Sequence, residues 1–240
     1  MSQSLEVSVV MATHNMARFL PRALGSLLCQ SLASSRFEIL VVDDGSTDST
    51  PAVLSRFGGQ ITALRNLNCQ GLVPSVNRGL ERARGRYFVR VDADDEVAPD
   101  LLYLGSRMLA ANPRAAAVVS DRIEVRQGKR VRTRVEPHNP YTLIACGSMF
   151  STRLLRQLGG YRPLYWEEYD LYLRLREHGE FLYLPVPLYF YRKHARSMTH
   201  RPEQRKRGWQ ELLGRWGAEK LRSAGTSAEL EAVIRNQAIQ

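Results

Sequence analysis

The sequence predicts an α/β fold: a doubly wound, mostly parallel sheet of the Rossmann-like kind. In the first 95 residues, runs of β-forming residues alternate with segments whose apolar residues recur every three or four positions. Three of the apolar runs end in polar residues. The ends of parallel strands meet at one edge of a sheet, where ligands bind in such folds. A length of 240 residues suits one large domain with a terminal appendage.

Composition narrows the class of protein. Hydrophobic residues make up 44% and charged residues 24%, as in a globular protein with an ample core. No apolar run approaches the ~18 residues that span a bilayer, and we see no secretory signal at the N-terminus. The three cysteines have no CxxC spacing, which favours a reducing cytosol over a disulfide framework. The net charge of +10 favours anionic partners without selecting among phosphates, acidic lipids and nucleic acid.

The elements of the first half follow from periodicity and from start and stop signals. Helical spacing of apolar residues predicts helices at 19–28, 50–57 and 72–83. Thr50 before Pro51 predicts the start of the second of these helices. Runs rich in β-forming residues predict strands at 7–11, 37–42, 61–64 and 87–92.

The second half is less regular. Apolar periodicity predicts helices at 101–111 and 152–158, and a further helix that starts near 167. Alternation of arginines with apolar residues predicts a hairpin of two strands, 122–126 and 130–135. We interpret the basic face of this hairpin as a solvated surface rather than a dedicated binding surface. The remaining predicted strands are 116–119, 146–150 and 188–192.

The most informative stretch is the strand that runs into Asp92, Asp94 and Asp95. Carboxylates crowded at a strand end repel one another unless a cation lies between them, and a hard divalent ion is the usual solution. An isolated Asp-x-Asp is more often a solvated turn that caps a helix. Here two other strands also end in polar residues, at 12–15 and at 43–46. Together the three strand ends predict a metal site that holds a phosphorylated ligand.

With these stretches the chain resembles the family 2 glycosyltransferases, which have the GT-A fold. The stretches 7–15, 38–48, 71–85 and 92–95 match the donor-binding half of the family in order and spacing. Gly159-Gly160-Tyr161, Glu167-Glu168-Tyr169-Asp170-Leu171 and Tyr191-Arg192-Lys193-His194 match the acceptor half. The resemblance covers roughly residues 5–200. By this resemblance, residues 1–200 form a GT-A domain, with a nucleotide-sugar-binding half at 1–98 and an acceptor-binding half at 99–200. A basic amphipathic helical tail follows at 201–240.

The resemblance implies inverting transfer of a sugar from a nucleotide diphosphate sugar to an acceptor hydroxyl, with UDP the favoured nucleotide. The acceptor would be a glycan or a lipid-linked glycan of bacterial-type cell-surface polysaccharide or glycolipid synthesis. The enzyme would then work in the cytoplasm or at the inner face of the membrane. Asp44 would accept a hydrogen bond from the uracil ring, with Asp43 as the second choice. The implied nucleotide-sugar-binding residues are Ala12, Thr13, Asn15, Asp43, Asp44, Asn77, Asp92, Ala93 and Arg192.

The implied cofactor is Mn²⁺ or Mg²⁺. Asp94 would ligate the metal directly, whereas Asp92 would contact the ribose or the waters of the metal. The metal would bridge the diphosphate and neutralise charge on the leaving group. His194 could complete the metal shell, which would favour Mn²⁺, although a lone histidine is as often a packed or surface residue. Arg192 could hold phosphate oxygens.

An inverting displacement needs a general base on the face opposite the leaving group. In the family this base is an aspartate that follows a glutamate, whereas here the pair is Glu167-Glu168. We expect Glu168 to be the base and keep Glu167 as the alternative, because the longer side chain changes the geometry. Acids at this position also suit the N-terminus of a helix, whatever their chemistry.

Three other classes of protein share parts of this pattern. A nucleotidyltransferase that makes nucleotide sugars would carry a glycine-rich phosphate loop after the first strand, and 12–15 offers none. A response-regulator receiver domain would be about half as long. A basic nucleic-acid-binding protein would account for the charge, but the aromatic residues are not interleaved with arginines as stacking platforms would be.

The tail carries one apolar stripe among many basic residues: Trp209, Leu212, Leu213 and Trp216 at i, i+3, i+4 and i+7. Tryptophan beside arginine suits a helix that lies in the headgroup region of an anionic membrane. The alternative is that the stripe packs on the catalytic domain or on a second subunit of a homo-oligomer. The spacing alone leaves both interpretations open.

Overall fold

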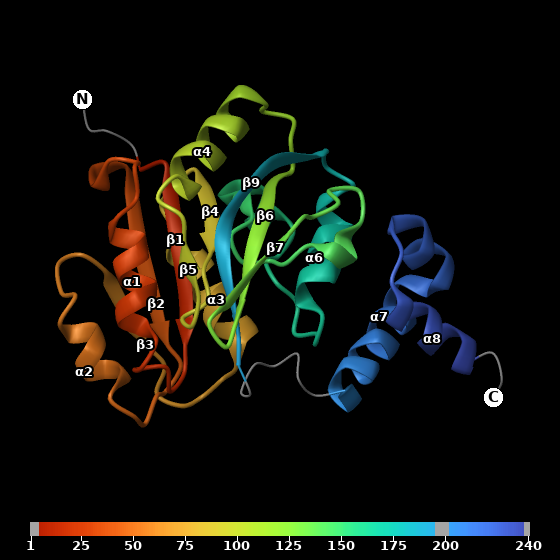
Figure 1. Ribbon diagram of the computed structural model, residues 1–240, viewed down its shortest axis with the longest axis horizontal. Coiled ribbons are helices and arrows are strands. Elements are labelled where there is room, and N and C mark those ends of the chain that lie inside the picture. The colour runs from red at the N-terminus through yellow and green to blue at the C-terminus, as the bar shows by residue number, and fades with distance from the viewer. Residues whose placement is uncertain (1–4, 195–201, 238–240) are drawn as a thin grey trace.

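The computed structural model describes residues 5–194 and 202–237. Within them, the strands form one nine-stranded sheet in the order β3-β2-β1-β4-β8-β6-β9-β5, and β7 pairs with β6 (Figure 1). The strands are β1 (Val7–Thr13), β2 (Phe37–Asp43), β3 (Thr62–Arg65), β4 (Tyr87–Arg90), β5 (Glu96–Val97), β6 (Ala117–Arg126), β7 (Lys129–Thr133), β8 (Met149–Ser151) and β9 (Phe181–Lys193). The α-helices are α1 (Leu20–Leu28), α2 (Thr50–Ser55), α3 (Leu72–Arg82), α4 (Leu101–Ala111), α5 (Thr152–Gln157), α6 (Glu167–Leu175), α7 (Pro202–Ala224) and α8 (Ala228–Gln237).

The first four strands form the parallel part of the sheet. β1 pairs in parallel with β2 and with β4, and β2 pairs in parallel with β3. In this register Thr13 lies opposite Asp43, so the polar ends of β1 and β2 meet at one edge. The predicted parallel sheet is confirmed, together with the meeting of its strand ends.

Two hydrophobic cores, one on each face of the sheet, hold the helices in place. Val9 of β1 belongs to the core that includes α1 and α4, whereas its neighbour Val10 belongs to the core that includes α3 and α6. Successive side chains of a strand point to opposite faces, so a continuous apolar strand is expected where both faces are covered. The doubly wound arrangement is therefore confirmed.

The second half extends the sheet with antiparallel and parallel pairs. β8 runs antiparallel to both β4 and β6, and β6 runs parallel to β9. The predicted strands 116–119 and 122–126 are one strand, because register shifts around Asp121 let the pairing with β9 continue. β9 also begins earlier than predicted, at Phe181.

Several predicted boundaries in the first half differ from the structure by one or two residues. β4 ends at Arg90 rather than at residue 92, because the backbone turns after it and Asp92 N donates to Tyr189 Oη at 3.1 Å. Thr50 is the first residue of α2 rather than its cap, since its Oγ1 accepts from Met16 N and Ser49 takes the cap position.

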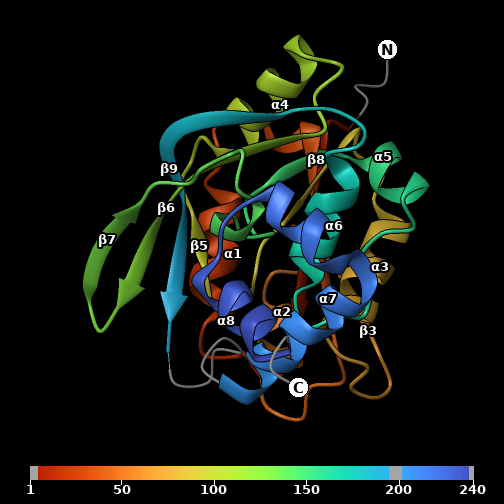
Figure 2. The same cartoon turned by 90° about the vertical axis from the view of Figure 1, so that its right-hand side faces the viewer.

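The tail forms a third core against α6. Trp209, Leu212 and Leu213 of α7 are buried with Trp166 and Leu173, and α7 bends at Gly217, whose φ is 73°. Figures 1 and 2 show α7 and α8 beside α6, at the side of the molecule away from β3. The apolar stripe therefore packs on the rest of the domain. In this arrangement the stripe is covered by protein, so the structure does not support its insertion into a membrane. No helix in the described ranges is long and apolar enough to cross a membrane.

Candidate active site

A cavity of about 390 Å³ opens at the edge where the parallel strands end. The ends of β1, β2, β4 and β9 contribute to its lining, together with the start of α6. The predicted site residues that line it are Ala12, Thr13, Asp44, Asp92, Ala93, Asp94, Glu167, Glu168, Arg192 and His194. The structure thus brings the implied donor, metal and base residues around one cavity, although they come from positions up to 182 apart in sequence (Ala12 to His194).

The three carboxylates of the acidic motif have different surroundings. Asp95 is buried and accepts from Tyr189 Oη and from Arg192 N, both at 2.7 Å, so it holds the end of β9. Asp92 faces the cavity and accepts from Arg90 Nε at 2.8 Å and from Arg90 Nη2 at 3.1 Å. Asp94 Oδ2 lies 2.8 Å from His194 Nε2 at the cavity wall. Only Asp92 and Asp94 are therefore placed to contact a ligand.

Asp94 and His194 form the pair that could hold a divalent cation. Burial, followed by the charge of Asp92, raises the pKa of the Asp94 carboxyl. The ring of Phe19 stacks on His194 with the centroids 5.2 Å apart, which orients the imidazole. Within the described ranges no three His, Cys, Asp or Glu side chains group as a complete metal site. An oxygen and a nitrogen ligand fit Mn²⁺ or Mg²⁺ as a partial shell, which a diphosphate and water would complete.

Asp44 organises the loop 66–71 beside the cavity. Its Oδ1 accepts from Asn66 Nδ2 at 2.7 Å and from Gln70 N at 2.9 Å. Its Oδ2 accepts from Gly71 N at 2.8 Å and from the Cys69 thiol at 3.3 Å. Burial alone would raise the pKa of Asp44, but these hydrogen bonds outweigh it and lower the pKa to about 2. The four acceptor positions of the carboxylate are thus in use, and the thiol is the weakest donor among them.

Three of the implied donor-binding residues do not line the cavity. Asn15, with a φ of 55°, accepts from Thr47 N and Asp48 N and so holds the loop after β2. Asp43 Oδ1 accepts from Ser46 N in the same loop. Asn77 is bonded to both backbone groups of Tyr161 and ties α3 to the loop before α6. At these positions the structure shows contacts that hold loops, and their contact with a donor stays a prediction.

Glu167 and Glu168 begin α6 and line the cavity. Glu167 Oε1 accepts from Arg90 Nη1 at 2.8 Å, and both side chains are buried. Glu168 has no basic partner at salt-bridge distance among the described residues. Burial, followed by the charge of Glu167, raises the pKa of Glu168 well above its usual value. A cavity carboxylate with a raised pKa is the expected form of a general base.

Arg90 is the site residue that motif reasoning missed. It is buried at the end of β4 and its guanidinium joins Asp92 on one side to Glu167 on the other. The signal in the sequence is an arginine inside an apolar strand, because a buried cation needs carboxylate partners. His14, Cys146, Tyr165 and Trp166 also line the cavity without having been predicted.

The fold and the site define a class of enzyme, and comparisons with known proteins agree with it. The model of the family "Glycosyl transferase family 2" matches residues 8–165. The chain therefore belongs to glycosyl transferase family 2, and its fold is GT-A. The predicted family is confirmed.

Several relatives were found by sequence. The chain is 29% identical over 199 residues to the putative glycosyltransferase EpsE of Bacillus subtilis, and the match covers 75% of this chain and 69% of EpsE. It is 34% identical over 122 residues to the succinoglycan biosynthesis protein ExoO of Rhizobium meliloti, covering 50% of this chain and 34% of ExoO. An uncharacterized glycosyltransferase of Nostoc is 36% identical over 102 residues, covering 41% of this chain. The chain spans only 31% of that Nostoc protein.

Two solved structures share the fold. Staphylococcus aureus TarS in complex with UDP-GlcNAc superposes with a TM-score of 0.73 at 19% identity, covering 90% of this chain and 70% of that one. The mannosyltransferase PcManGT from Pyrobaculum calidifontis, in complex with GDP-Man and Mn²⁺, has a TM-score of 0.69 at 17% identity and covers 98% of this chain and 79% of its own.

Proposed function

We propose that this chain transfers a sugar from a nucleotide diphosphate sugar to an acceptor hydroxyl with inversion at the anomeric carbon. The observation that carries the proposal is the bridge formed by Arg90. It joins Asp92, in the donor motif, to Glu167, beside the candidate base, across one cavity. The bridge supports the proposal because it keeps the donor motif and the candidate base at one cavity, as an in-line displacement requires of donor and base.

UDP is the favoured nucleotide of the donor. TarS is known in complex with UDP and with UDP-GlcNAc, whereas PcManGT is known with GDP-Man, so the fold accepts both bases. In this chain, Thr13 Oγ1 is buried at the cavity and has no hydrogen-bond partner among the described residues. A ring N–H of uracil would take the place of the Cys69 thiol at Asp44, because that thiol is the weakest of its four donors.

A divalent cation fits at Asp94 and His194 beside the donor. When bound it would neutralise the diphosphate and stabilise the charge of the leaving group. Arg192 donates through Nε to the backbone oxygen of Asp94 at 3.0 Å and through Nη2 to Glu96 at 2.5 Å. These bonds fix its guanidinium at the cavity wall, where it would bind phosphate oxygens.

Glu168 is the general base of the proposed reaction. Glu167 is less suited to accept a proton, because its Oε1 is engaged by Arg90 in a buried ion pair. Glu168 lines the same cavity and is free of such a pair among the described residues, so it would take the proton of the acceptor hydroxyl. The acceptor would be a glycan of a polysaccharide pathway, in agreement with the name of ExoO and with the poly(ribitol-phosphate) transferase activity in the name of TarS.

A donor screen with two variants tests the proposal. Hydrolysis and transfer are measured with a panel of nucleotide sugars in Mn²⁺, in Mg²⁺ and in excess chelator. Glu168→Gln should lower transfer by about 10²–10⁴-fold while the donor Kd stays nearly constant. Asp94→Asn should abolish transfer, and Glu81→Gln, an exposed change on α3, should leave it unaltered.

The pH profile checks the assignment of the base. The ionised form of Glu168 is the active one, and its pKa is raised, so transfer should be lost as the pH falls through this raised pKa. The acidic limb should therefore lie at higher pH than the usual range of a glutamate, and Glu168→Asp should keep a limb while Glu168→Gln loses it. A product that retains the anomeric configuration of the donor in NMR spectra would contradict the mechanism.

A further inference from the structure

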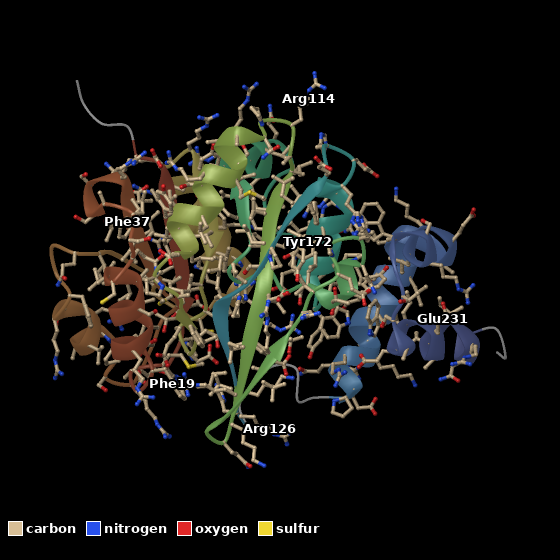
Figure 3. The ribbon with its side chains drawn as sticks, turned by 45° about the horizontal axis from the view of Figure 1, so that its top comes forward. Phe19, Phe37, Arg114, Arg126, Tyr172 and Glu231 are labelled. Carbon is tan, nitrogen blue, oxygen red and sulfur yellow. The ribbon has the colours of Figure 1, made fainter. Side chains whose placement is uncertain are left out.

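A basic groove lies beside the donor cavity and shares Arg192 with it, and the proposed transfer makes no use of its other cations. Three adjoining hollows of about 620, 470 and 330 Å³ share Arg192, and two of them reach His194 or Asp94 at the wall of the donor cavity. Figure 3 shows Phe19 and Arg126, two residues of this groove, at the same edge of the molecule. The cations that line it are Arg18, Arg22, Arg126, Arg130, Arg192 and Lys193.

The cations of the basic groove come from three elements and are only partly neutralised. Arg192 pairs with Glu96 and Lys193 with Glu124, each at 2.5 Å. Arg18 and Arg22 at the start of α1, and Arg126 and Arg130 around the β6–β7 turn, are exposed and form no ion pair with a described residue. Cations that lie close together on separate elements repel one another and destabilise the folded chain. An anionic ligand would offset this repulsion, so the cluster indicates an anion-binding site.

Aromatic rings hold two of these arginines and form part of the floor. The guanidinium of Arg18 lies 5.6 Å from the ring centroid of Phe19, and that of Arg130 lies 5.7 Å from that of Phe190. Cation–π contacts reduce the freedom of the two side chains while leaving their N–H groups able to donate. Arginine in this setting can bind phosphate oxygens through its planar fork of donors.

The shape of the groove favours a chain-like anion over a membrane surface. The hollows are concave and lie between α1, the hairpin and β9, whereas a bilayer surface is flat. Binding in a bilayer also needs apolar side chains that insert. On the hairpin the one large apolar side chain that is exposed, among the described residues, is Val131.

We propose that the basic groove binds the phosphate groups of a phosphate-bearing acceptor glycan while the reacting hydroxyl of that glycan enters the donor cavity. This inference rests on the proposed function and names the chemical class of its acceptor. It also revises the interpretation of the hairpin's basic face, because Arg126 and Arg130 face a groove continuous with the site rather than bulk solvent alone.

Charge reversal at two elements of the groove tests the inference. The probe is a fluorescent glycerol-phosphate oligomer, compared with polyglutamate of equal charge, and binding is followed by anisotropy at two salt concentrations. Arg18→Glu with Arg126→Glu should weaken oligomer binding by about tenfold or more and reduce its salt dependence. Arg82→Glu with Arg153→Glu, a matched pair of exposed arginines on α3 and α5, should bind as the unaltered chain does.

The outcomes separate the inference from the function on which it rests. Support requires tighter binding of the oligomer than of polyglutamate, lost in the groove variant, with donor hydrolysis and donor Kd unchanged. A groove variant that weakens the donor itself would overturn the inference, because the groove would then serve the donor diphosphate. Binding to phosphatidylglycerol vesicles without binding to the oligomer would overturn it in favour of a membrane. Absence of hydrolysis with every donor would instead overturn the proposed function.

Discussion

Arg90 stands in an apolar strand where the pattern of neighbouring residues calls for another hydrophobic side chain. Its guanidinium is 5% exposed, as buried as the Glu167 carboxylate that it contacts, at 6%. A buried ion pair costs desolvation that only good geometry and further hydrogen bonds return. Here Asp92 supplies these bonds through two contacts with the same guanidinium. The three charges therefore depend on one another, and the two halves of the site are coupled through a single side chain.

Replacing Arg90 should expose this coupling. Arg90→Met leaves the buried Glu167 carboxylate without its partner, which typically costs about 3–5 kcal/mol of stability. Arg90→Met with Glu167→Gln removes the uncompensated charge as well, so the double variant should be more stable than Arg90→Met alone. Urea unfolding midpoints measure the difference. Strictly additive effects of the two substitutions would contradict the coupling.

At the scale of single residues, the sequence predicted which acidic residues lie at the cavity, but not which hydrogen bonds the polar residues make. Strand-end acids can be read from the pattern because their position follows from the sheet, and Asp44, Asp92 and Asp94 do line the cavity. The loop contacts of Asn15 and Asn77 could not be predicted, because an amide bonds equally well to a ligand and to a nearby backbone group, and only the folded chain shows which backbone groups are in reach.

Helix α7 contacts the segment that carries the acids. Trp166 Nε1 donates to Arg205 O at 3.3 Å, and Trp216 Nε1 donates to Asp170 Oδ1 at 3.1 Å. These contacts flank Glu167 and Glu168 at the start of α6. Helix propensity and periodicity predicted α6 and α7 as separate helices. They could not predict that the two helices pack together, because this contact depends on the tertiary fold and local sequence patterns carry no information on it.

Gly208 is the position at which this packing can be tested. A Cβ on Gly208 would lie 2.7 Å from Cδ1 of Tyr165 and 2.9 Å from Cδ1 of Trp166, so Gly208→Val must displace the segment before Glu167. We expect kcat to fall while the donor Kd changes little, because the donor motif lies on other elements. Gly214 lies in the same helix with no atom within 4 Å of such a Cβ, and Gly214→Ala should be neutral or stabilise by up to ~1 kcal/mol. Equal kinetic effects of the two substitutions would refute this role of α7.

The molecule as a whole is a GT-A domain whose C-terminal helices pack against α6 and the segment before it. Tyr141 Oη donates to Leu221 O at 2.8 Å, and Asn139 Nδ2 donates to Thr226 O at 3.1 Å, so the tail is bonded to the loop after β7 as well as to α6. The stripe of Trp209, Leu212, Leu213 and Trp216 was visible in the sequence, but its partner was not. A packed face and a membrane-bound face have the same amphipathic pattern, so periodicity cannot separate them.

Removing the tail should therefore damage the enzyme rather than release it from a membrane. Deletion of residues 202–240 uncovers Trp166 and Leu173, which are buried in the third core. We expect a lower Tm, increased binding of a hydrophobic dye and a loss of transfer greater than the loss of donor binding, because the uncovered segment precedes the acids of α6 while the donor motif lies elsewhere. Trp209→Ala, a change from large to small in the same core, should act in the same direction at a cost of about 3–5 kcal/mol. A truncated chain that keeps its Tm and its transfer rate, but no longer binds anionic vesicles, would show instead that the tail serves the membrane.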